Sequence, residues 1–141
     1  MNNELNVSFP GISINESLAR GLAAQFVSLM DPTVEELSDI RTAVSEAVTN
    51  AVIHGCVPAG GEVRMSLRAQ GRMLTVTVSD EGRGIEDIEL ARQPFYTTMP
   101  EAERSGLGFA VMEAFMDSVE VESAPGRGTK VTMRKRLNGD G

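Results

Sequence analysis

The most constraining feature of this sequence is the order of three short polar or glycine-bearing segments among stretches of regular hydrophobic period. Glu46 and Asn50 lie one turn apart in a helical pattern. Asp80 then begins an Asp-x-Gly-x-Gly segment where a strand pattern closes, and Gly106-Leu107-Gly108 opens a later helical pattern. A nucleotide could use all three segments: a carboxylate beside an amide, an aspartate next to bare backbone, and free amides at the start of a helix. The spacing predicts a nucleotide site.

Hydrophobic periodicity predicts a domain of helices and hairpins. Alternating residues predict strands over Leu5–Phe9, Val63–Leu67, Leu74–Val78, Val119–Glu122 and Lys130–Met133. Helical patterns predict one helix with Asn15 as N-cap that ends at Asp31-Pro32, a second that opens with a capping box at Thr33 and stops at Gly55, and a third over residues 106–116. Residues 82–106 are glycine-bearing and charged, and we expect mostly loop there. We expect a single domain over residues 1–141.

Composition excludes several classes of protein. The net charge of −7 argues against a protein that binds the phosphate backbone of nucleic acids. A lone cysteine, Cys56, excludes an intramolecular disulfide and suits a reducing cytoplasm. The first residues have neither the charge nor the apolar core of a signal peptide, and no apolar run approaches the about 18 residues of a membrane span. We therefore expect a cytoplasmic protein that binds neither nucleic acid nor membrane.

The second predicted helix has two stripes. Its apolar stripe should pack on the sheet and consists of Leu37, Ile40, Val44, Ala47, Val48 and Ala51. Asp39, Ala43, Glu46 and Asn50 lie on a separate stripe at the edge of that face. An isolated pair of this kind is most often a surface Glu and a solvated Asn, but Asn is a poor residue for a helix interior and calls for another explanation. An amide oxygen can ligate Mg²⁺, and a neighbouring carboxylate can deprotonate an attacking hydroxyl.

The strand-end segment admits two interpretations. Asp80 could simply begin an ordinary turn. Alternatively, its carboxylate accepts from the amino group of adenine, while Gly82 and Gly84 let a planar base lie against the backbone. Neither glycine pair completes the dinucleotide fingerprint, and the sequence contains no P-loop. Gly106-Leu107-Gly108 offers helix amides that suit phosphate, although such a start is often only a flexible cap.

Taken together, the segments resemble the GHKL ATPases, which include sensor histidine kinases, gyrase-type ATPases and bacterial anti-sigma serine kinases. Glu46–Asn50 is similar to the N-box, and the two glycine segments are similar to the glycine boxes. This resemblance implies a two-layer α+β sandwich with a mixed, mainly antiparallel sheet and helices on one face. Ala91–Thr98 and Glu103–Phe109 are similar to the sporulation branch of the anti-sigma serine kinases.

The resemblance implies ATP and Mg²⁺ as cofactors and assigns roles to residues. Glu46 is the implied general base, Asn50 the implied Mg²⁺ ligand, and Asp80 the implied adenine reader, supported through water by Thr129. Residues 93–108 are the implied lid, with Arg104 as a γ-phosphate contact. The other implied nucleotide-binding residues are His54, Gly82, Gly84, Thr97, Thr98, Ser105, Gly106, Leu107 and Gly108. The ring of His54 could instead interact with the end of its helix or with the lid.

The implied function is that of an anti-sigma factor and protein serine kinase. Such a protein inhibits a sporulation sigma factor of the sigma-F type, phosphorylates an anti-anti-sigma protein on serine, and forms a homodimer. Two alternatives remain open: a general-stress anti-sigma kinase, and a nucleotide-dependent regulator without kinase activity. Glu46 favours an enzyme, and Arg92-Gln93-Pro94 favours the sporulation branch.

The first predicted helix suggests a docking surface independently of any resemblance. Its predicted outward face consists of Ser17, Arg20, Gly21, Ala24 and Ser28, opposite a predicted stripe of Leu18, Leu22, Phe26 and Leu29. Solvated helix faces usually carry residues of better helix propensity, so small residues around one arginine indicate a shelf for a partner with Arg20 as anchor. The plainer alternative is a tolerated weak helix.

Overall fold

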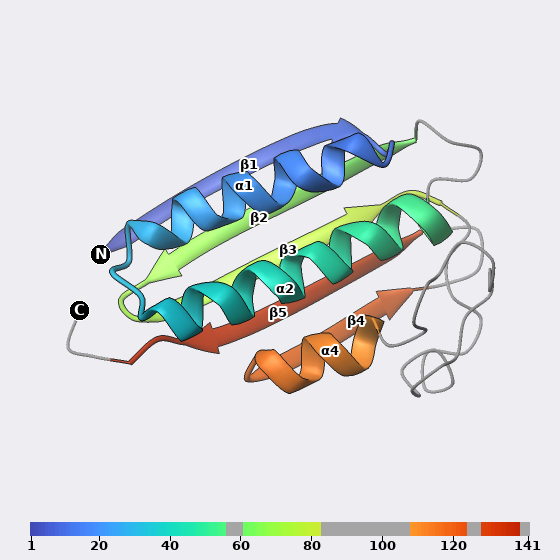
Figure 1. Cartoon of the computed structure of the whole chain (residues 1–141). Helices are drawn as coiled ribbons and strands as arrows, with labels where there is room; N and C mark the ends of the chain where they lie inside the picture. The colour runs from blue at the N-terminus through green and yellow to red at the C-terminus, as the bar shows by residue number, and fades with distance from the viewer. Residues whose placement is uncertain (56–60, 83–107, 124–127, 139–141) are drawn as a thin grey trace.

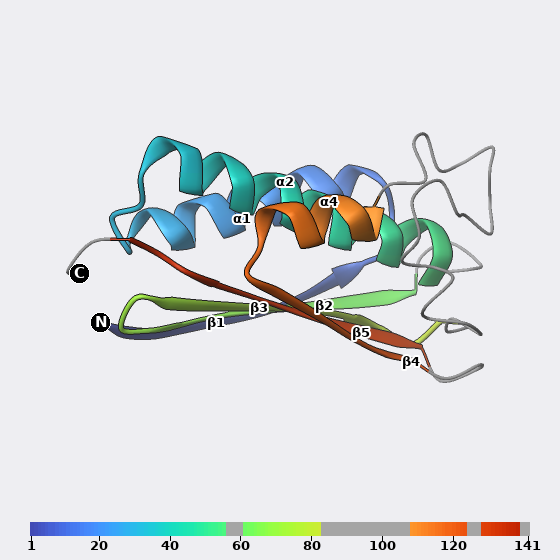
Figure 2. The ribbon, with the colours of Figure 1, turned by 90° about the horizontal axis from the view of Figure 1, so that it is seen from below.

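A five-stranded sheet in the order β1-β2-β3-β5-β4 carries the helices on one face (Figures 1 and 2). The structure is a computed structural model that describes residues 1–55, 61–82, 108–123 and 128–138. The strands are β1 (Asn2–Pro10), β2 (Glu62–Gln70), β3 (Met73–Asp80), β4 (Ser118–Ser123) and β5 (Thr129–Arg136). The helices are α1 (Ile14–Ser28), α2 (Val34–Asn50), the π-helical turn η1 (Ala51–Gly55) and α4 (Gly108–Phe115). All four described strand pairings are antiparallel.

The predicted strands and both hairpins are confirmed. In β3 every second side chain is buried against the helices, as the alternation of Leu74, Val76 and Val78 predicts. The turn between β2 and β3 is centred on Gly71, whose φ of 61° favours glycine. The core consists mainly of aliphatic and methionine side chains from the sheet face and from α1, α2 and α4, together with Phe9, Phe26 and Phe109.

The helix start predicted for α2 is confirmed, but the one predicted for α1 is wrong. The hydroxyl of Thr33 accepts from the backbone N–H of Glu36 at 3.0 Å, and the Glu36 carboxylate accepts from the N–H of Thr33 at 2.8 Å. This is the predicted capping box. The prediction of Asn15 as the N-cap of α1 is wrong, because α1 begins at Ile14 after Ser13. The Asn15 amide instead donates to the carbonyl of Pro10 at 2.9 Å and ties the helix to the end of β1.

The predicted apolar stripe of α1 is wrong in part. Leu18 is 52% exposed and Leu29 is 58% exposed. The buried residues of this helix and its C-terminal extension are Ala19, Ala23, Phe26, Val27 and Met30. The reason is that α1 packs against α2 as well as against the sheet, and small alanines allow two helices to approach closely. The buried face is therefore rotated by one residue, which leaves Leu18 and Leu29 on the surface.

A polar cluster closes the end of the molecule opposite the ends of β3 and α2. The guanidinium of Arg72 donates to the carbonyl of Met30 and, at 2.6 Å, to that of Asn138. The N–H of Asn138 donates to the buried carboxylate of Glu36 at 2.7 Å. The α1–α2 junction, the β2–β3 turn and the chain after β5 are thus joined. Among the described helices, none is long and apolar enough to cross a membrane.

Candidate functional site

The predicted site residues of the described chain gather at one end of the two layers. There the C-terminal end of α2, the N-terminal end of α4, the end of β3 and the start of β5 lie close to one another (Figure 1). Asn50 and Gly108 are in contact between the two helices. Asp80 and Thr129 are direct partners across the β3–β5 pairing. The fold therefore brings three of the predicted segments together, as their order in the sequence indicates.

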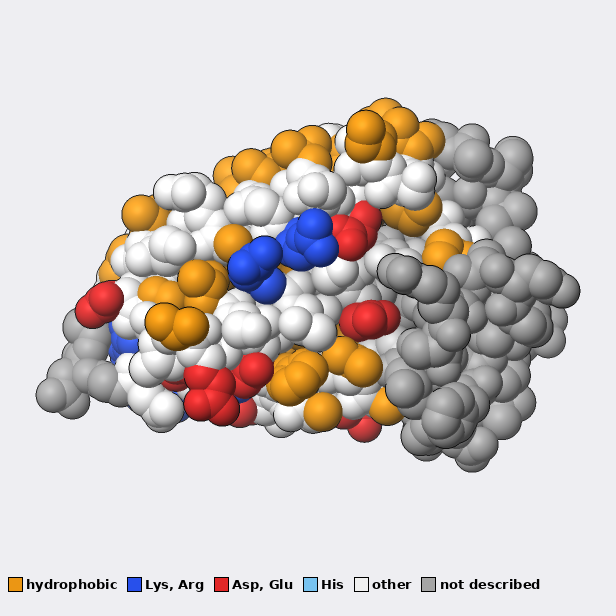
Figure 3. Space-filling model, viewed as in Figure 1, with side chains coloured by type: hydrophobic (Ala, Val, Ile, Leu, Met, Phe, Trp, Pro, Cys, Tyr) orange, Lys and Arg blue, Asp and Glu red, His pale blue; other side chains and the backbone are white. Residues whose placement is uncertain are grey.

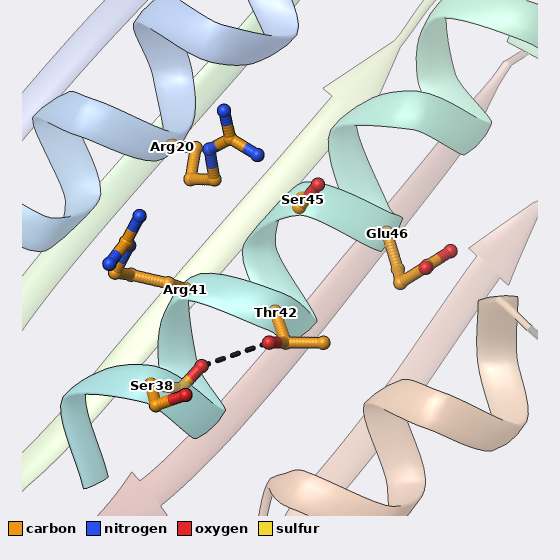
Figure 4. A pocket seen from close by; sticks show the side chains of 6 residues that line it. All are labelled: Arg20, Ser38, Arg41, Thr42, Ser45 and Glu46. Carbon is orange, nitrogen blue, oxygen red and sulfur yellow. Dashed lines mark hydrogen bonds between the residues drawn. The ribbon is translucent and has the colours of Figure 1, made fainter. Parts of the chain in front are cut away.

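Glu46 and Asn50 lie on the flank of α2 that is directed toward α4. Both are partly buried, and Ala43 on the same stripe is fully buried. Figure 4 shows Glu46 extending from α2 on the side of α4. Ile40, Val44 and Val48 are buried in the core as predicted, but Ala43 is buried with them, so the predicted separation of the two stripes holds for Glu46 and Asn50 and is wrong for Ala43.

Asn50 is held against the first residue of α4. A β-carbon at Gly108 would lie 2.8 Å from Nδ2 and 3.1 Å from Oδ1 of Asn50. Only a glycine accommodates the amide in this position. Gly108 at the start of α4 therefore positions the amide of Asn50 at the end of α2.

Asp80 is a nearly buried carboxylate, 8% exposed, at the end of β3. One of its oxygens accepts from the N–H of Gly82 at 2.9 Å, and the carboxylate also accepts from the N–H of Thr129. Burial raises the pKa of Asp80 above its ordinary value, and these two donors only partly offset the effect. A buried acceptor next to the bare backbone of Gly82 is suited to a donor group on a flat ligand.

Gly128 permits the close pairing of β3 and β5 at this point. It has a φ of 81°, and a β-carbon there would lie 2.0 Å from the backbone oxygen of Asp80. Gly128 was not among the predicted site residues. A glycine directly before a predicted site residue, at the start of a strand, is the signal that could have found it.

The side chain of Thr129 has a partner that was not predicted. Its hydroxyl lies 2.9 Å from the hydroxyl of Ser123, and the Ser123 hydroxyl also donates to the carbonyl of Gly128 at 2.9 Å. Ser123 is paired with Thr129 across β4 and β5. Extending the predicted hairpin by two residues would have indicated this pair, because Val121 and Val131 already face one another.

Several predicted site residues lie outside the described residues, so their placement is not tested. They are Gly84, Thr97, Thr98, Arg104, Ser105, Gly106 and Leu107. The backbone of His54 belongs to η1, but its side chain is also outside what the structure describes.

A polar groove of about 280 Å³ runs along α2 beside α1. It is lined by Arg20, Ser38, Arg41, Thr42, Ser45 and Glu46. Figure 4 shows the guanidinium groups of Arg20 and Arg41 between the two helices, and Figure 3 shows two basic side chains side by side in the middle of the helical face. Arg41 was not predicted, because its approach to Arg20 depends on how the helices pack.

Arg20 is partly engaged within the molecule. Its guanidinium lies 3.6 Å from the carboxylate of Glu16 one turn earlier. The same Glu16 oxygen accepts from the hydroxyl of Ser45 on α2 at 2.8 Å. Within the described part of the chain Arg41 of α2 has no ion-pair partner, and the charged residues that line the groove are two arginines and Glu46.

The comparisons with known proteins agree with this geometry. A family model described as the histidine kinase-like ATPase domain matches residues 15–135. The solved RsbU and RsbW domains of a Mycobacterium tuberculosis protein superpose with a TM-score of 0.70 at 20% identity, covering 96% of this chain and 32% of that one. The class that the fold and the site define is therefore the histidine kinase-like ATPase domain.

Two curated relatives define the group more narrowly. The anti-sigma F factor of Clostridium acetobutylicum is 52% identical over 137 residues, which are 97% of this chain and 96% of the relative. The anti-sigma F factor of Bacillus licheniformis is 49% identical over 139 residues, 98% of this chain and 95% of the relative. The chain belongs to the anti-sigma F factor family.

Proposed function

We propose that this protein is an anti-sigma factor and an ATP-dependent protein serine kinase. It binds a sporulation sigma factor of the sigma-F type in the cytoplasm, keeps it from RNA polymerase, and uses Mg²⁺-ATP to phosphorylate an anti-anti-sigma protein on serine. The observation that carries the proposal is the meeting of Asn50, Gly108 and Asp80 at one end of a histidine kinase-like fold. Near half identity to proteins named anti-sigma F factors supports the choice of partner.

The adenine base is assigned to the end of β3. The carboxylate of Asp80 accepts from the amino group of the base, and the backbone at Gly82 and Gly84 lies against its flat face. Thr129 supports Asp80 through its N–H, and its hydroxyl takes part through water. The burial of Asp80 supports this assignment, because a hydrogen bond to a charged acceptor is stronger where water is excluded.

The Mg²⁺ ion is assigned to Asn50. Among the described residues no group of three His, Cys, Asp or Glu could hold a metal ion. We expect a divalent ion at this place to take most of its ligands from phosphate oxygens and water, which is how Mg²⁺ is usually held in nucleotide sites. The packed amide of Asn50 fits one such position. When bound, the ion neutralises charge on the phosphates during transfer.

Glu46 is the proposed general base. It lies one turn before Asn50 on the same flank of α2 and also lines the groove that contains Arg20. A protein docked on the groove would present a serine hydroxyl within reach of this carboxylate. Glu46 would accept the hydroxyl proton as the hydroxyl attacks the terminal phosphate.

The lid and most of the phosphate contacts are proposed for residues outside the described ones; Gly108 at the start of α4 is described. Arg104 contacts the γ-phosphate, and the N–H groups of Gly106, Leu107 and Gly108 receive phosphate oxygens at the start of α4. His54, Thr97, Thr98 and Ser105 complete the proposed nucleotide-binding residues.

Two surfaces of α1 support two kinds of partner. The groove with Arg20 and Arg41 suits an acidic side chain of the sigma factor or of the anti-anti-sigma protein. Homodimer formation is assigned to the exposed apolar side chains of α1 and its C-cap, since Ile14, Leu18 and Leu29 are all mostly exposed. The single domain proposed here would then carry partner, nucleotide and self-association surfaces.

The proposal is tested by phosphoryl transfer with the purified anti-anti-sigma protein and labelled ATP, with and without Mg²⁺. We expect phosphoserine only with Mg²⁺. Glu46→Gln is nearly isosteric and should lower the transfer rate by roughly 10²–10⁴ while ATP binding and sigma binding persist. Sigma binding without any transfer by the wild type would support the nucleotide-dependent regulator instead. Stronger binding to a general-stress sigma factor would support the other alternative.

A further inference from the structure

Three polar side chains form a row across the sheet where its apolar rows end. Asp80 on β3 is paired with Thr129 on β5, which is paired with Ser123 on β4. Residues paired directly across antiparallel strands point to the same face. The preceding row on this face is Val78, Val131 and Val121, and it packs under the helices. The polar row therefore lies at the edge of the core, which agrees with the burial of the Asp80 carboxylate.

The direction of the hydrogen bonds in this row follows from counting protons. The carbonyl of Gly128 can only accept, so the hydroxyl of Ser123 donates its single proton there. The contact of 2.9 Å between the hydroxyls of Ser123 and Thr129 then requires Thr129 to be the donor. The only hydroxyl proton of Thr129 is thus directed at β4. Toward any ligand beside Asp80, Thr129 presents lone pairs.

The row consequently offers acceptors to a ligand. The ionised carboxylate of Asp80 has no proton, and two of its acceptor positions are already used by the N–H groups of Gly82 and Thr129. An exocyclic amino group can donate to such a row, whereas a ring carbonyl at the same place would meet lone pairs. A water bound to Thr129 must donate one of its hydrogens to the Thr129 hydroxyl oxygen. The second hydrogen of that water can then be donated to the unprotonated ring nitrogen of a 6-aminopurine.

We infer that Ser123 is a positioning residue that sets base specificity by fixing the direction of the Thr129 hydroxyl. It makes the site select 6-aminopurine over 6-oxopurine nucleotides. The inference rests on the proposed function, in which Asp80 reads adenine. Without Ser123, the Thr129 hydroxyl can turn its proton toward the base, and the distinction between the two purines weakens.

The test compares ADP with inosine diphosphate, which has the same sugar and phosphates but a 6-oxo group. Calorimetry is performed on the wild type, Ser123→Ala, Ser123→Thr and the control Ser118→Ala from the other end of β4. In Ser123→Ala we expect ADP affinity to fall by about 5- to 20-fold, the effect of one hydrogen bond, with little change for inosine diphosphate. Ser123→Thr keeps the hydroxyl and should keep the preference, and Ser118→Ala should change neither affinity.

A parallel variant, Thr129→Val, removes the hydroxyl that Ser123 orients, with little change of shape. It should lower the ADP preference by a similar factor, and the double variant should be no worse than either single one. If Ser123→Ala fails to fold, the Thr129→Val ratio decides. An unchanged ratio, or an equal loss for both nucleotides, overturns the role of Ser123. Unchanged ADP affinity in Asp80→Asn would instead overturn the adenine assignment of the proposed function.

Discussion

The side-chain amide of Asn50 packs so closely against Gly108 that a β-carbon on Gly108 would lie only 2.8 Å from Nδ2 of Asn50. The end of α2 and the start of α4 are therefore in direct contact, although they are far apart in the sequence. The amide that we assign to Mg²⁺ depends on a glycine in another helix for its orientation.

Gly108→Ala should impair metal-dependent binding and leave the fold intact. The atoms that must move belong to the far end of a flexible side chain, so we expect a melting temperature near that of the wild type. The displaced amide should lower ATP affinity in Mg²⁺ by roughly tenfold, as is typical for residues that orient a ligand. Affinity in EDTA should change little. Gly21→Ala, which meets nothing within 4 Å, is the control. Equal losses with and without Mg²⁺ would contradict this role for Gly108.

Asp80→Asn should weaken nucleotide binding while it stabilises the free protein. Burial raises the pKa of Asp80, so the ionised form is disfavoured in the folded state and its charge lowers stability above the folded pKa. We expect a higher free energy of unfolding at neutral pH in the variant. ADP affinity should fall by about 1–3 kcal/mol. Unchanged affinity by calorimetry would remove the assignment of Asp80.

ADP affinity of the wild type should also depend on pH in a defined direction. The carboxylate accepts from the base only when ionised, so affinity should be full above the folded pKa of Asp80 and should decrease as the pH falls through it. Because that pKa is raised, the loss should begin at a higher pH than for an exposed aspartate. Calorimetry over a pH series measures this, and Asp80→Asn should show no such step.

Arg20→Glu should abolish at least one partner complex while ATP binding and melting temperature stay near those of the wild type. The change reverses one of the two positive charges in the groove and replaces the Arg20–Glu16 ion pair, 3.6 Å in the wild type, by two like charges. Arg41→Glu should act in the same direction, and Arg68→Glu on β2, which pairs with Glu4 away from the groove, serves as control. Pull-downs with each partner measure the effect. If both groove variants still bind both proteins normally, the docking surface lies elsewhere.

Glu36→Gln should destabilise the protein and reduce its sensitivity to acid. Burial disfavours the charge of Glu36, but bonds from Asn138 and Thr33 and the nearby Arg72 outweigh it and lower the pKa. A lowered folded pKa means that the stabilisation is present above the pKa of the unfolded chain and is lost as the pH falls through the folded pKa. We expect a loss of about 1–3 kcal/mol at neutral pH in urea titrations. Glu35→Gln, one residue earlier and exposed, should behave like the wild type.

The parts of the fold that depend on neighbouring residues were predictable. The capping box at Thr33, the turn at Gly71 and the alternation of β3 are local patterns, and the structure confirms them. The buried face of α1 was not predictable, because Leu18 and Ala19 compete for the core and the contact with α2 decides between them. Other contacts between distant segments were likewise not predictable, because they depend on how the helices and the sheet pack.

The candidate site likewise contains residues that the sequence predicts and residues that only the packing reveals. Glu46, Asn50 and Asp80 could be selected from their spacing alone. Ser123 and Gly128 become visible only when the register of the β4–β5 hairpin is known, and Arg41 only when α1 and α2 are packed. Residues that hold other residues in place leave little trace in a single sequence.

The bond from Ser45 to Glu16 has a thermodynamic consequence. Ser45 connects α2 to the residue that pairs with Arg20, and its neighbour Glu46 extends toward the other side of the same helix (Figure 4). The proposed partner surface on α1 and the proposed nucleotide site at the end of α2 are thus both connected to α2. By linkage, whatever factor the nucleotide applies to partner affinity, the partner must return to nucleotide affinity. Titrating the nucleotide with and without bound partner therefore gives this factor, and the effect of the nucleotide on partner affinity follows without a further experiment.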